Sequence, residues 1–304
     1  MSKNRSALRN HVEFTAFRAA RSLTAFLSPT AVERFADFSG YLFSMIGGRR
    51  RRIIDFNLGL AFPEKGDRER WRLARGVARH FARSALDAMR IQRLRPDELL
   101  AAVDISGWEN VERASSLGRG VIFLTAHIGS WEVAALIIGL KLDAGLSVVN
   151  RPLDNPFLEA ELDRLRRLYG NRVFGKRKIV REMLRELKSN NAIGILIDQR
   201  APESQGIEVP FFGHPARTHP VLARLSRKTG APVVPVVAFR EAPGRYSLRF
   251  DEPVMVDTID EAEREDLPLT ARFMAILEAA ITERPEQWLW YHDRWKQLRI
   301  GNSE

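Results

Sequence analysis

The sequence of 304 residues contains no cysteine. This absence excludes disulfides, thiol nucleophiles and cysteine-ligated zinc or iron–sulfur sites. The six histidines are scattered, without His-Glu-x-x-His or a comparable ligand spacing, so we predict no metal site. Chemistry must therefore come from histidine, carboxylate, hydroxyl or cationic side chains.

Long apolar runs are also missing. No stretch of roughly 18 consecutive apolar residues occurs, which argues against a conventional membrane-spanning helix. Met1–Asn10 is polar and basic, and Glu13, Arg18 and Arg21 interrupt the stretch that follows, so the pattern of a secretory signal peptide is absent. We therefore expect the protein to start in the cytoplasm.

The composition is that of a folded, basic protein. With 45% hydrophobic residues, the chain can bury a core, as one large domain or two small ones. The formal net charge of +10 predicts an anionic partner: nucleic acid, a phospholipid surface, an acidic carrier protein or a phosphorylated substrate. Charge alone does not choose among them.

Residues 1–100 read as amphipathic helices. The first stops at Ser28-Pro29, and a second begins at Thr30, where Thr30 and Glu33 match a capping box. Its apolar positions recur at helical spacing until Gly47-Gly48, and the four arginines Arg49–Arg52 follow. We expect this amphipathic helix and the arginines after it to attach the protein, peripherally or by shallow insertion, to the cytoplasmic face of an anionic inner membrane. The alternative is that the helix packs on the core and the arginines are solvated.

The pattern changes near residue 101, after a third predicted helix at Asp67–Leu94. Short apolar runs then alternate with helical stretches, which predicts a layered α/β/α fold with a mostly parallel or mixed central sheet. We expect two regions, 1–100 and 101–304, packed as one globular unit. The predicted strands are Val103–Ser106, Val121–Ala126, Ser147–Asn150, Arg172–Phe174, Ala192–Ile197, Pro232–Phe239 and Ser247–Phe250. Predicted helices between them include Trp131–Leu140, Pro156–Tyr169, Ile179–Ser189 and Pro220–Thr229.

The most informative segment is Gly120–Glu132, in which an apolar strand runs directly into His127 and, five positions later, Glu132. On a continuous helix these two side chains would lie about 140° apart. They can meet if His127 lies in the turn after the strand and Glu132 in the first turn of the next helix, with Gly129 and Ser130 forming the turn. We expect Glu132 to hold one ring nitrogen of His127, so that the other accepts a proton from a substrate hydroxyl. The alternative is an interior histidine beside a helix-start charge.

Several further segments, in the same order along almost the whole chain, resemble the bacterial lipid A late acyltransferases, the lauroyl and myristoyl transferases of the lysophospholipid acyltransferase superfamily. That family carries a His-x4-Asp or His-x4-Glu motif, which His127 and Glu132 match. The other similar blocks are Asn57-Leu58 with Ala61-Phe62-Pro63-Glu64, Asn150-Arg151-Pro152 with Asn155-Pro156, Asp198-Gln199-Arg200, Val209-Pro210-Phe211-Phe212-Gly213, Gly230–Pro235 and Pro285–Trp290.

The resemblance implies an O-acyltransferase with an acyl-chain cleft and no cofactor. Its donor would be an acyl-thioester, usually acyl carrier protein, with acyl-CoA as the other option, and its acceptor a hydroxyl of an anionic lipid A precursor glycolipid. The chemistry of the residues agrees, because an alcohol needs a base near neutral pKa to attack a thioester, and histidine is one. Backbone N–H groups of Gly129 and Ser130, or an arginine, would stabilise the tetrahedral oxyanion.

Three further residues are predicted to bind substrate. Arg166 falls where the family places an arginine and suits a phosphate of the acceptor or of the donor's phosphopantetheine, although it can equally belong to an exposed helix face paired with Glu161 and Asp163. Asp198 follows a wholly apolar strand, where ligand contacts gather in α/β sheets. Arg200 is the weakest of the three candidates.

Other functions remain open at this stage. The acceptor can be another membrane lipid, such as a phosphatidylinositol mannoside, a glycerophospholipid or an aminolipid. A nucleic-acid-binding module would account for the charge, but no helix-turn-helix, zinc finger or basic aromatic sheet pattern is present, and we expect no nucleic-acid partner. The third hypothesis is that the protein is a non-catalytic membrane scaffold. A serine hydrolase is disfavoured because Gly-x-Ser-x-Gly is absent.

Overall fold

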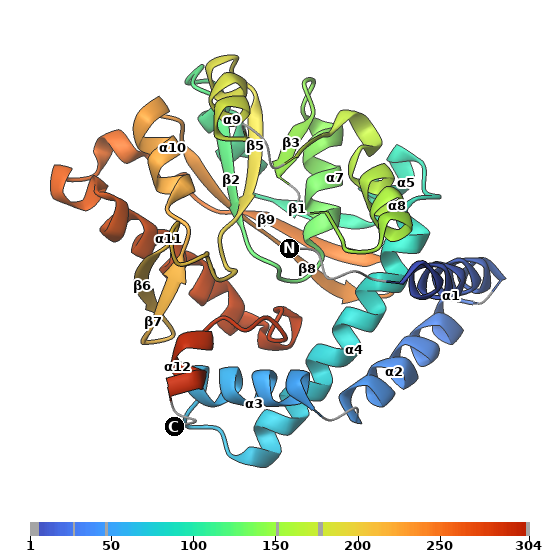
Figure 1. Ribbon diagram of the computed structural model, residues 1–304. Helices are drawn as coiled ribbons and strands as arrows, with labels where there is room; N and C mark the ends of the chain where they lie inside the picture. Colours follow the sequence, from blue (N-terminus) through green and yellow to red (C-terminus); the bar gives the residue numbers. More distant parts are fainter. Residues whose placement is uncertain (1–5, 27, 46–47, 150–151, 176–178, 302–304) are drawn as a thin grey trace.

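A seven-stranded sheet forms the centre of the computed structural model, which describes residues 6–26, 28–45, 48–149, 152–175 and 179–301 (Figure 1). The strand order is β1-β9-β8-β2-β5-β3-β4, and every neighbouring pair is parallel except β8 and β9. The predicted mostly parallel sheet is therefore confirmed. The strands are β1 Val103–Ser106, β2 Val121–Thr125, β3 Leu146–Val149, β4 Arg172–Phe174, β5 Ala192–Leu196, β8 Val233–Ala242 and β9 Arg245–Phe250.

Helices cover both faces of the sheet, which confirms the layered α/β/α architecture (Figure 1). The central strand β2 shows why: all five of its residues are buried, with Ile122 and Leu124 in one core and Val121 and Phe123 in the other. Parallel strands that are covered on both faces read as continuous apolar runs. The helices of the second core are α5 Pro96–Ala101, α6 Trp108–Ser115, α7 Trp131–Lys141 and α8 Pro156–Arg166, and those of the first include α9 Ile179–Lys188, α10 Val221–Thr229 and α11 Asp266–Glu283.

Four helices precede α5: α1 Ala7–Phe26, α2 Pro29–Met45, α3 Arg49–Ala61 and α4 Asp67–Ile91. The long helix α4 contacts the other three and links them to the sheet (Figure 1). Helix α2 approaches α4 closely, because a Cβ on Gly40 would lie 2.7 Å from the Arg79 Cα. Among the described residues, none of the helices is long and apolar enough to cross a membrane. The division into regions 1–100 and 101–304 stays a prediction.

The start of α2 differs from the predicted capping box. Ser28 is the capping residue, since its Oγ accepts a hydrogen bond from the Ala31 N–H, and Pro29 occupies the first helical position. The carboxylate of Glu33 faces Arg83 and Arg240 instead of Thr30. The capping-box prediction was wrong because Glu33 has an ionic partner from elsewhere in the fold.

Several elements were not predicted. Arg49–Arg52 form the first turn of α3, where Arg51 pairs with Asp55, so they are not a basic segment that ends a helix. Helix α8 ends at Arg166 because Tyr169 adopts a left-handed conformation at φ 60° within the short 3-10 turn Leu168–Gly170. The hairpin of β6 Ile207–Phe211 and β7 His214–Thr218, helix α11, and the short helix α12 Lys296–Gly301 were also missed. Asn150 and Arg151 lie outside the described residues.

Candidate active site

The site lies at the carboxyl ends of two neighbouring parallel strands. Strands β2 and β5 are in register with Thr125 opposite Leu196. His127 and Asp198 each follow two residues later, so the register brings them together. Ligands of open α/β sheets bind at this edge. After His127 the chain turns at Gly129, which has φ +58°, and enters α7 at Trp131.

Asp198 holds both the ring and the backbone of His127. Its Oδ1 lies 2.9 Å from His127 Nδ1, and its Oδ2 accepts hydrogen bonds from the His127 N–H at 3.0 Å and from Trp288 Nε1 at 2.8 Å. Asp198 is 1% exposed, so its carboxylate depends on these donors. Because a carboxylate only accepts, His127 Nδ1 carries a proton and Nε2 presents a lone pair.

The pKa values of the two groups shift in opposite directions. Burial by itself would lower the pKa of His127, but the charge of Asp198 and its hydrogen bond raise it, with a further contribution from Glu132. Burial would raise the pKa of Asp198, but His127 and the Trp288 N–H hold it well below its usual range. The pair therefore favours an ionised Asp198 and stabilises the imidazolium form of His127.

Glu132 does not hold the imidazole, and this corrects the role predicted for it. Its carboxylate binds the Arg166 guanidinium, with Arg166 Nη2 2.7 Å and Nε 3.0 Å from Oε1. Glu132 belongs to the first turn of α7, and its partner comes from the end of α8. Both side chains are mostly buried, at 19% and 16% exposed. Glu132 acts on His127 through its charge, while Asp198 supplies the hydrogen bond.

The His127 ring also contacts a side chain that the sequence did not single out. Gln199 Nε2 lies 3.2 Å from His127 Nε2 and 3.5 Å from Nδ1, so the amide lies across the ring, and the ring of Trp131 packs edge-on against the imidazole at 5.4 Å between centroids. The His127 side chain is 24% exposed, so it is not sealed inside the core. Gln199 follows Asp198 directly, and only the strand register shows that it reaches the ring.

The predicted backbone donors of the turn are already engaged. The Gly129 N–H donates to the Gln287 carbonyl at 2.8 Å, and the Ser130 N–H donates to the Ala238 carbonyl at 2.7 Å. Neither is free to bind an oxyanion, which corrects that expectation. In contrast, Arg166 Nη1 is buried and has no hydrogen-bond partner among the described residues, so Arg166 keeps one donor for an anionic group.

Arg200 lies beside the dyad but does not reach it through an interaction with its side chain. Its backbone N–H donates to His292 Nε2 at 2.8 Å, and its guanidinium forms no ion pair within the described part of the chain. Burial lowers the pKa of His292 to about 4, which keeps this ring neutral. His292 and Trp288 belong to a carboxyl-terminal block whose contacts with Asp198 the sequence did not reveal. The described residues contain no group of three or more His, Asp or Glu side chains that could hold a metal ion.

A partly exposed His–Asp pair at the carboxyl edge of a parallel sheet is an arrangement suited to general-base chemistry in an enzyme. The model of the family described as bacterial lipid A biosynthesis acyltransferase matches residues 2–297, and the chain belongs to this family. It is an acyltransferase.

Named relatives agree with this assignment. The chain is similar to the lipid A biosynthesis lauroyltransferase of Escherichia coli K12, with 29% identity over 83% of this chain and 81% of the relative. The lipid A biosynthesis myristoyltransferase of the same organism is 25% identical over 89% of this chain and 81% of its own length. A solved structure, the 1-acyl-sn-glycerophosphate acyltransferase PlsC of Thermotoga maritima, gives a TM-score of 0.40 at 16% identity, covering 83% of this chain and 97% of that one.

Proposed function

We propose that the protein transfers a fatty acyl chain from an acyl-thioester, carried by acyl carrier protein, to a hydroxyl of a lipid A precursor, with His127 as general base. The family membership supports acyl transfer in lipid A biosynthesis. The observation that carries the mechanism is the His127 ring, whose Nδ1 is held by buried Asp198, so that Nε2 is the nitrogen left to accept a proton.

The reaction follows from this geometry. The acceptor hydroxyl oxygen attacks the thioester carbonyl while His127 Nε2 takes its proton. Asp198 stabilises the resulting imidazolium and keeps the ring in the correct tautomer. The tetrahedral intermediate then expels the thiolate, which recovers the proton from His127.

Arg166 and Glu132 form the second pair of the mechanism. Two nitrogens of the guanidinium bind Glu132, which fixes its plane, and the third nitrogen, Nη1, is buried with no hydrogen-bond partner in the part of the chain that the structure describes. A planar guanidinium suits either the developing oxyanion or a phosphate of the acceptor or of the phosphopantetheine. Arg200 supplies a second cation nearby for an anionic substrate group.

The test is turnover by the purified full-length chain with lauroyl acyl carrier protein and a purified lipid A precursor. We expect His127→Gln to lower kcat by about 10³-fold or more, because it removes the base. His219→Gln is the matched control, since His219 caps the start of α10 through Val221. Turnover by a folded His127→Gln protein at a rate near that of the unmodified chain would refute the assignment.

Two further experiments test the identity of the acyl donor and of the acceptor lipid. Lauroyl-CoA in place of the acyl carrier protein thioester tests the donor, and we expect a kcat/KM at least tenfold lower because CoA lacks the carrier's acidic surface. Mass spectrometry of the lipids from cells with and without the protein tests the acceptor. A mass increase on a glycerophospholipid, with no change in lipid A precursors, would replace the proposed acceptor.

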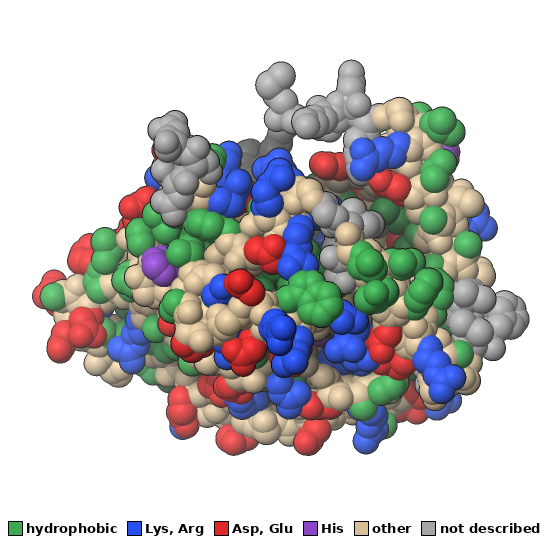
Figure 2. Space-filling model, turned by 90° about the horizontal axis from the view of Figure 1, so that it is seen from below, with side chains coloured by type: hydrophobic (Ala, Val, Ile, Leu, Met, Phe, Trp, Pro, Cys, Tyr) green, Lys and Arg blue, Asp and Glu red, His purple; other side chains and the backbone are tan. Residues whose placement is uncertain are grey.

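We also propose that the face formed by α2, α3 and α4 rests on the anionic cytoplasmic surface of the inner membrane. On α2, Phe35, Phe38, Leu42 and Met45 are 41%, 59%, 47% and 63% exposed, and their spacing places them on one side of the helix. Figure 2 shows green apolar side chains interleaved with blue cationic ones on the lower face of the molecule. Apolar side chains beside cations suit the headgroup region of a bilayer.

The cations of this face come mainly from α4. Arg68, Arg72 and Arg79 are exposed and make no ion pair within the described ranges, and Arg75 packs over the Trp71 ring at 4.5 Å. A hollow of about 400 Å³ is lined by Arg68, Trp71 and Arg72 with Arg51 from α3, and Asp67 is the one acidic residue among its lining residues. Like charges four residues apart on a helix repel each other, so an anionic surface relieves a cost that the free protein bears.

Vesicle co-sedimentation tests this face. We expect the double variant with Arg68→Gln and Arg72→Gln to bind phosphatidylglycerol-containing vesicles at least fivefold more weakly at low salt, because each cation near the surface contributes about 1 kcal/mol. The double variant with Arg181→Gln and Arg185→Gln removes the same charge from exposed positions of α9 and serves as the control. Equal binding by both double variants would remove the proposed orientation.

A further inference from the structure

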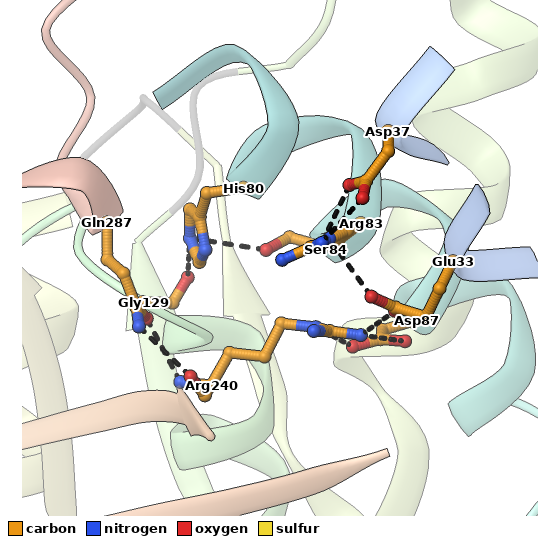
Figure 3. A network of polar contacts seen from close by, with 9 residues as sticks. All are labelled: Glu33, Asp37, His80, Arg83, Ser84, Asp87, Gly129, Arg240 and Gln287. Carbon is orange, nitrogen blue, oxygen red and sulfur yellow. Dashed lines mark hydrogen bonds and ion pairs between the residues drawn. The ribbon is translucent and has the colours of Figure 1, made fainter. Parts of the chain in front are cut away.

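The turn that carries His127 is held from outside by a second histidine. His80, from the middle of α4, lies with Nε2 3.2 Å from the carbonyl oxygen of Gly129 (Figure 3). Gly129 is buried, and a Cβ at this position would lie 1.9 Å from the Ala238 carbonyl oxygen. The Gly129 Cα therefore packs directly against the backbone of β8, and the Gly129 N–H and C=O each have a hydrogen-bond partner.

The protonation state of His80 follows from its contacts. We assign the proton to Nε2, because the Gly129 carbonyl only accepts hydrogen bonds; Ser84 Oγ lies 3.3 Å from the same nitrogen and accepts in this tautomer as well. His80 is 5% exposed. Burial is the main cause that lowers its pKa to about 4, and the nearby charges of Arg240 and Arg83 act in the same direction. At neutral pH His80 is thus a fixed, uncharged donor.

An ion cluster fixes the helix that bears His80. Arg240, at the end of β8, binds Asp87 of α4 with Nε 2.7 Å from Oδ2 and also binds Glu33 of α2 (Figure 3). Arg240 and Asp87 are 7% and 4% exposed, so neither charge has water as an alternative partner. The cluster therefore fixes α4 to the sheet at Asp87, about two helical turns beyond His80.

The same cluster reaches the turn by a second route. The Gln287 side chain binds both backbone groups of Arg240, with Oε1 accepting from the Arg240 N–H and Nε2 donating to its carbonyl, each at 3.0 Å. The carbonyl of Gln287 in turn accepts the Gly129 N–H. Both sides of the Gly129 peptide are thus connected to the Arg240 cluster, one through α4 and His80 and the other through Gln287.

We propose that His80 is a positioning residue for acyl transfer: its Nε2–H holds the Gly129 carbonyl and so fixes the turn that sets the His127 ring against Asp198. This inference rests on the proposed role of His127 as the base. Without the donor, a buried carbonyl loses its partner and the peptide rotates to find another. His127 lies two residues upstream in the same turn and moves with it.

Two substitutions separate the donor from the bulk of the ring. His80→Gln places an amide N–H at about the reach of Nε2, whereas the shorter His80→Asn does not reach the Gly129 carbonyl. We expect His80→Asn to lower kcat at least tenfold with less than a twofold change in KM, and His80→Gln to restore kcat to within about threefold of the unmodified chain. His219→Asn is the matched control and should leave kcat unchanged. If His80→Asn does not fold, His80→Leu takes its place, since it removes the donor without burying a new polar group.

Hydrogen exchange gives a readout that does not depend on turnover. We expect amide exchange in the segment 125–132 to be at least tenfold faster in His80→Asn than in His80→Gln, while exchange in β2 stays the same. Equal kcat and equal exchange in the two variants would overturn the proposal, as would failure of His80→Gln to restore either. If the exchange result holds and the unmodified chain shows no acyl transfer, the proposed function fails and the positioning of the turn stands.

Discussion

Two neutral buried histidines should make the fold sensitive to mild acid. Burial lowers the pKa of both His80 and His292 from 6.5 to about 4. Between pH 6.5 and 4, the unfolded chain therefore binds protons at these two positions and the folded chain does not. Because the unfolded state gains the protons, its free energy falls as the pH falls, and the free energy of unfolding decreases.

The magnitude follows from the pKa values. Each histidine should lower the free energy of unfolding by about 1.4 kcal/mol per pH unit across this window, and by about 3.4 kcal/mol in total. The two together amount to about 7 kcal/mol, which is comparable to the whole stability of an ordinary domain. His127 titrates in the opposite sense, because its raised pKa gives stability that is present below pH 6.5 and is lost as the pH rises through its folded pKa.

The assay is urea unfolding followed by circular dichroism at pH 6.0, 5.5, 5.0 and 4.5. We expect His80→Gln and His292→Gln each to reduce the dependence on pH by about 1.4 kcal/mol per pH unit. Glutamine keeps the hydrogen bond in both places, as a donor to the Gly129 carbonyl or as an acceptor from the Arg200 N–H. A double variant with the same acid slope as the unmodified chain would show that these rings do not stay neutral when folded.

Three further predictions concern the site and its support. Gly129→Ala, at φ +58° and with its Cβ 1.9 Å from the Ala238 carbonyl, should lower the free energy of unfolding by about 3 kcal/mol or more in the same urea assay. Asp198→Asn should lower kcat about 10³-fold or more and move the acid limb of kcat/KM to lower pH, because it removes the charge that raises the pKa of His127; an unmoved limb would contradict this. Arg240→Met removes the ionic partner of buried Asp87 and one of the two ionic partners of Glu33, and should cost about 3 to 5 kcal/mol by urea unfolding, whereas a loss below 1 kcal/mol would mean that the cluster is not a buried ionic network.

The strands of the central sheet could be predicted because a strand that is buried on both faces appears in the sequence as a continuous apolar run. The apolar runs of β2 and β5 each end within one residue of the predicted boundary. The β6–β7 hairpin was missed because Pro210 and Pro215 interrupt its strands, and proline argues against a strand unless the strand lies at an edge. Helix α3 was missed because Arg49–Arg52 place four cations at a helix start, which the helix dipole disfavours.

Part of the site was predictable for a different reason. A histidine directly after a buried strand is exceptional, and His127 is found where the sequence places it, in the turn before α7. Gln199 contacts His127, Trp288 contacts Asp198 and His292 contacts Arg200, and each of these pairs lies about 70 to 90 positions apart in the sequence. No local pattern marks such residues, because their roles depend on how the strands and the carboxyl-terminal segment pack.

The acidic partner of His127 shows how spacing along the chain and proximity in the fold can disagree. Glu132 is five residues away, but it begins a helix, where its charge suits the helix dipole and is taken by Arg166. Asp198 is 71 residues away, but β2 and β5 are parallel neighbours, and equal distances past Thr125 and Leu196 place it opposite His127. In a parallel sheet, the partner of a catalytic side chain is therefore expected on the neighbouring strand, the same number of residues past the last paired position. The sequence alone does not give the pairing of the two strands, because strands buried on both faces lack the alternation of polar and apolar residues that indicates the register.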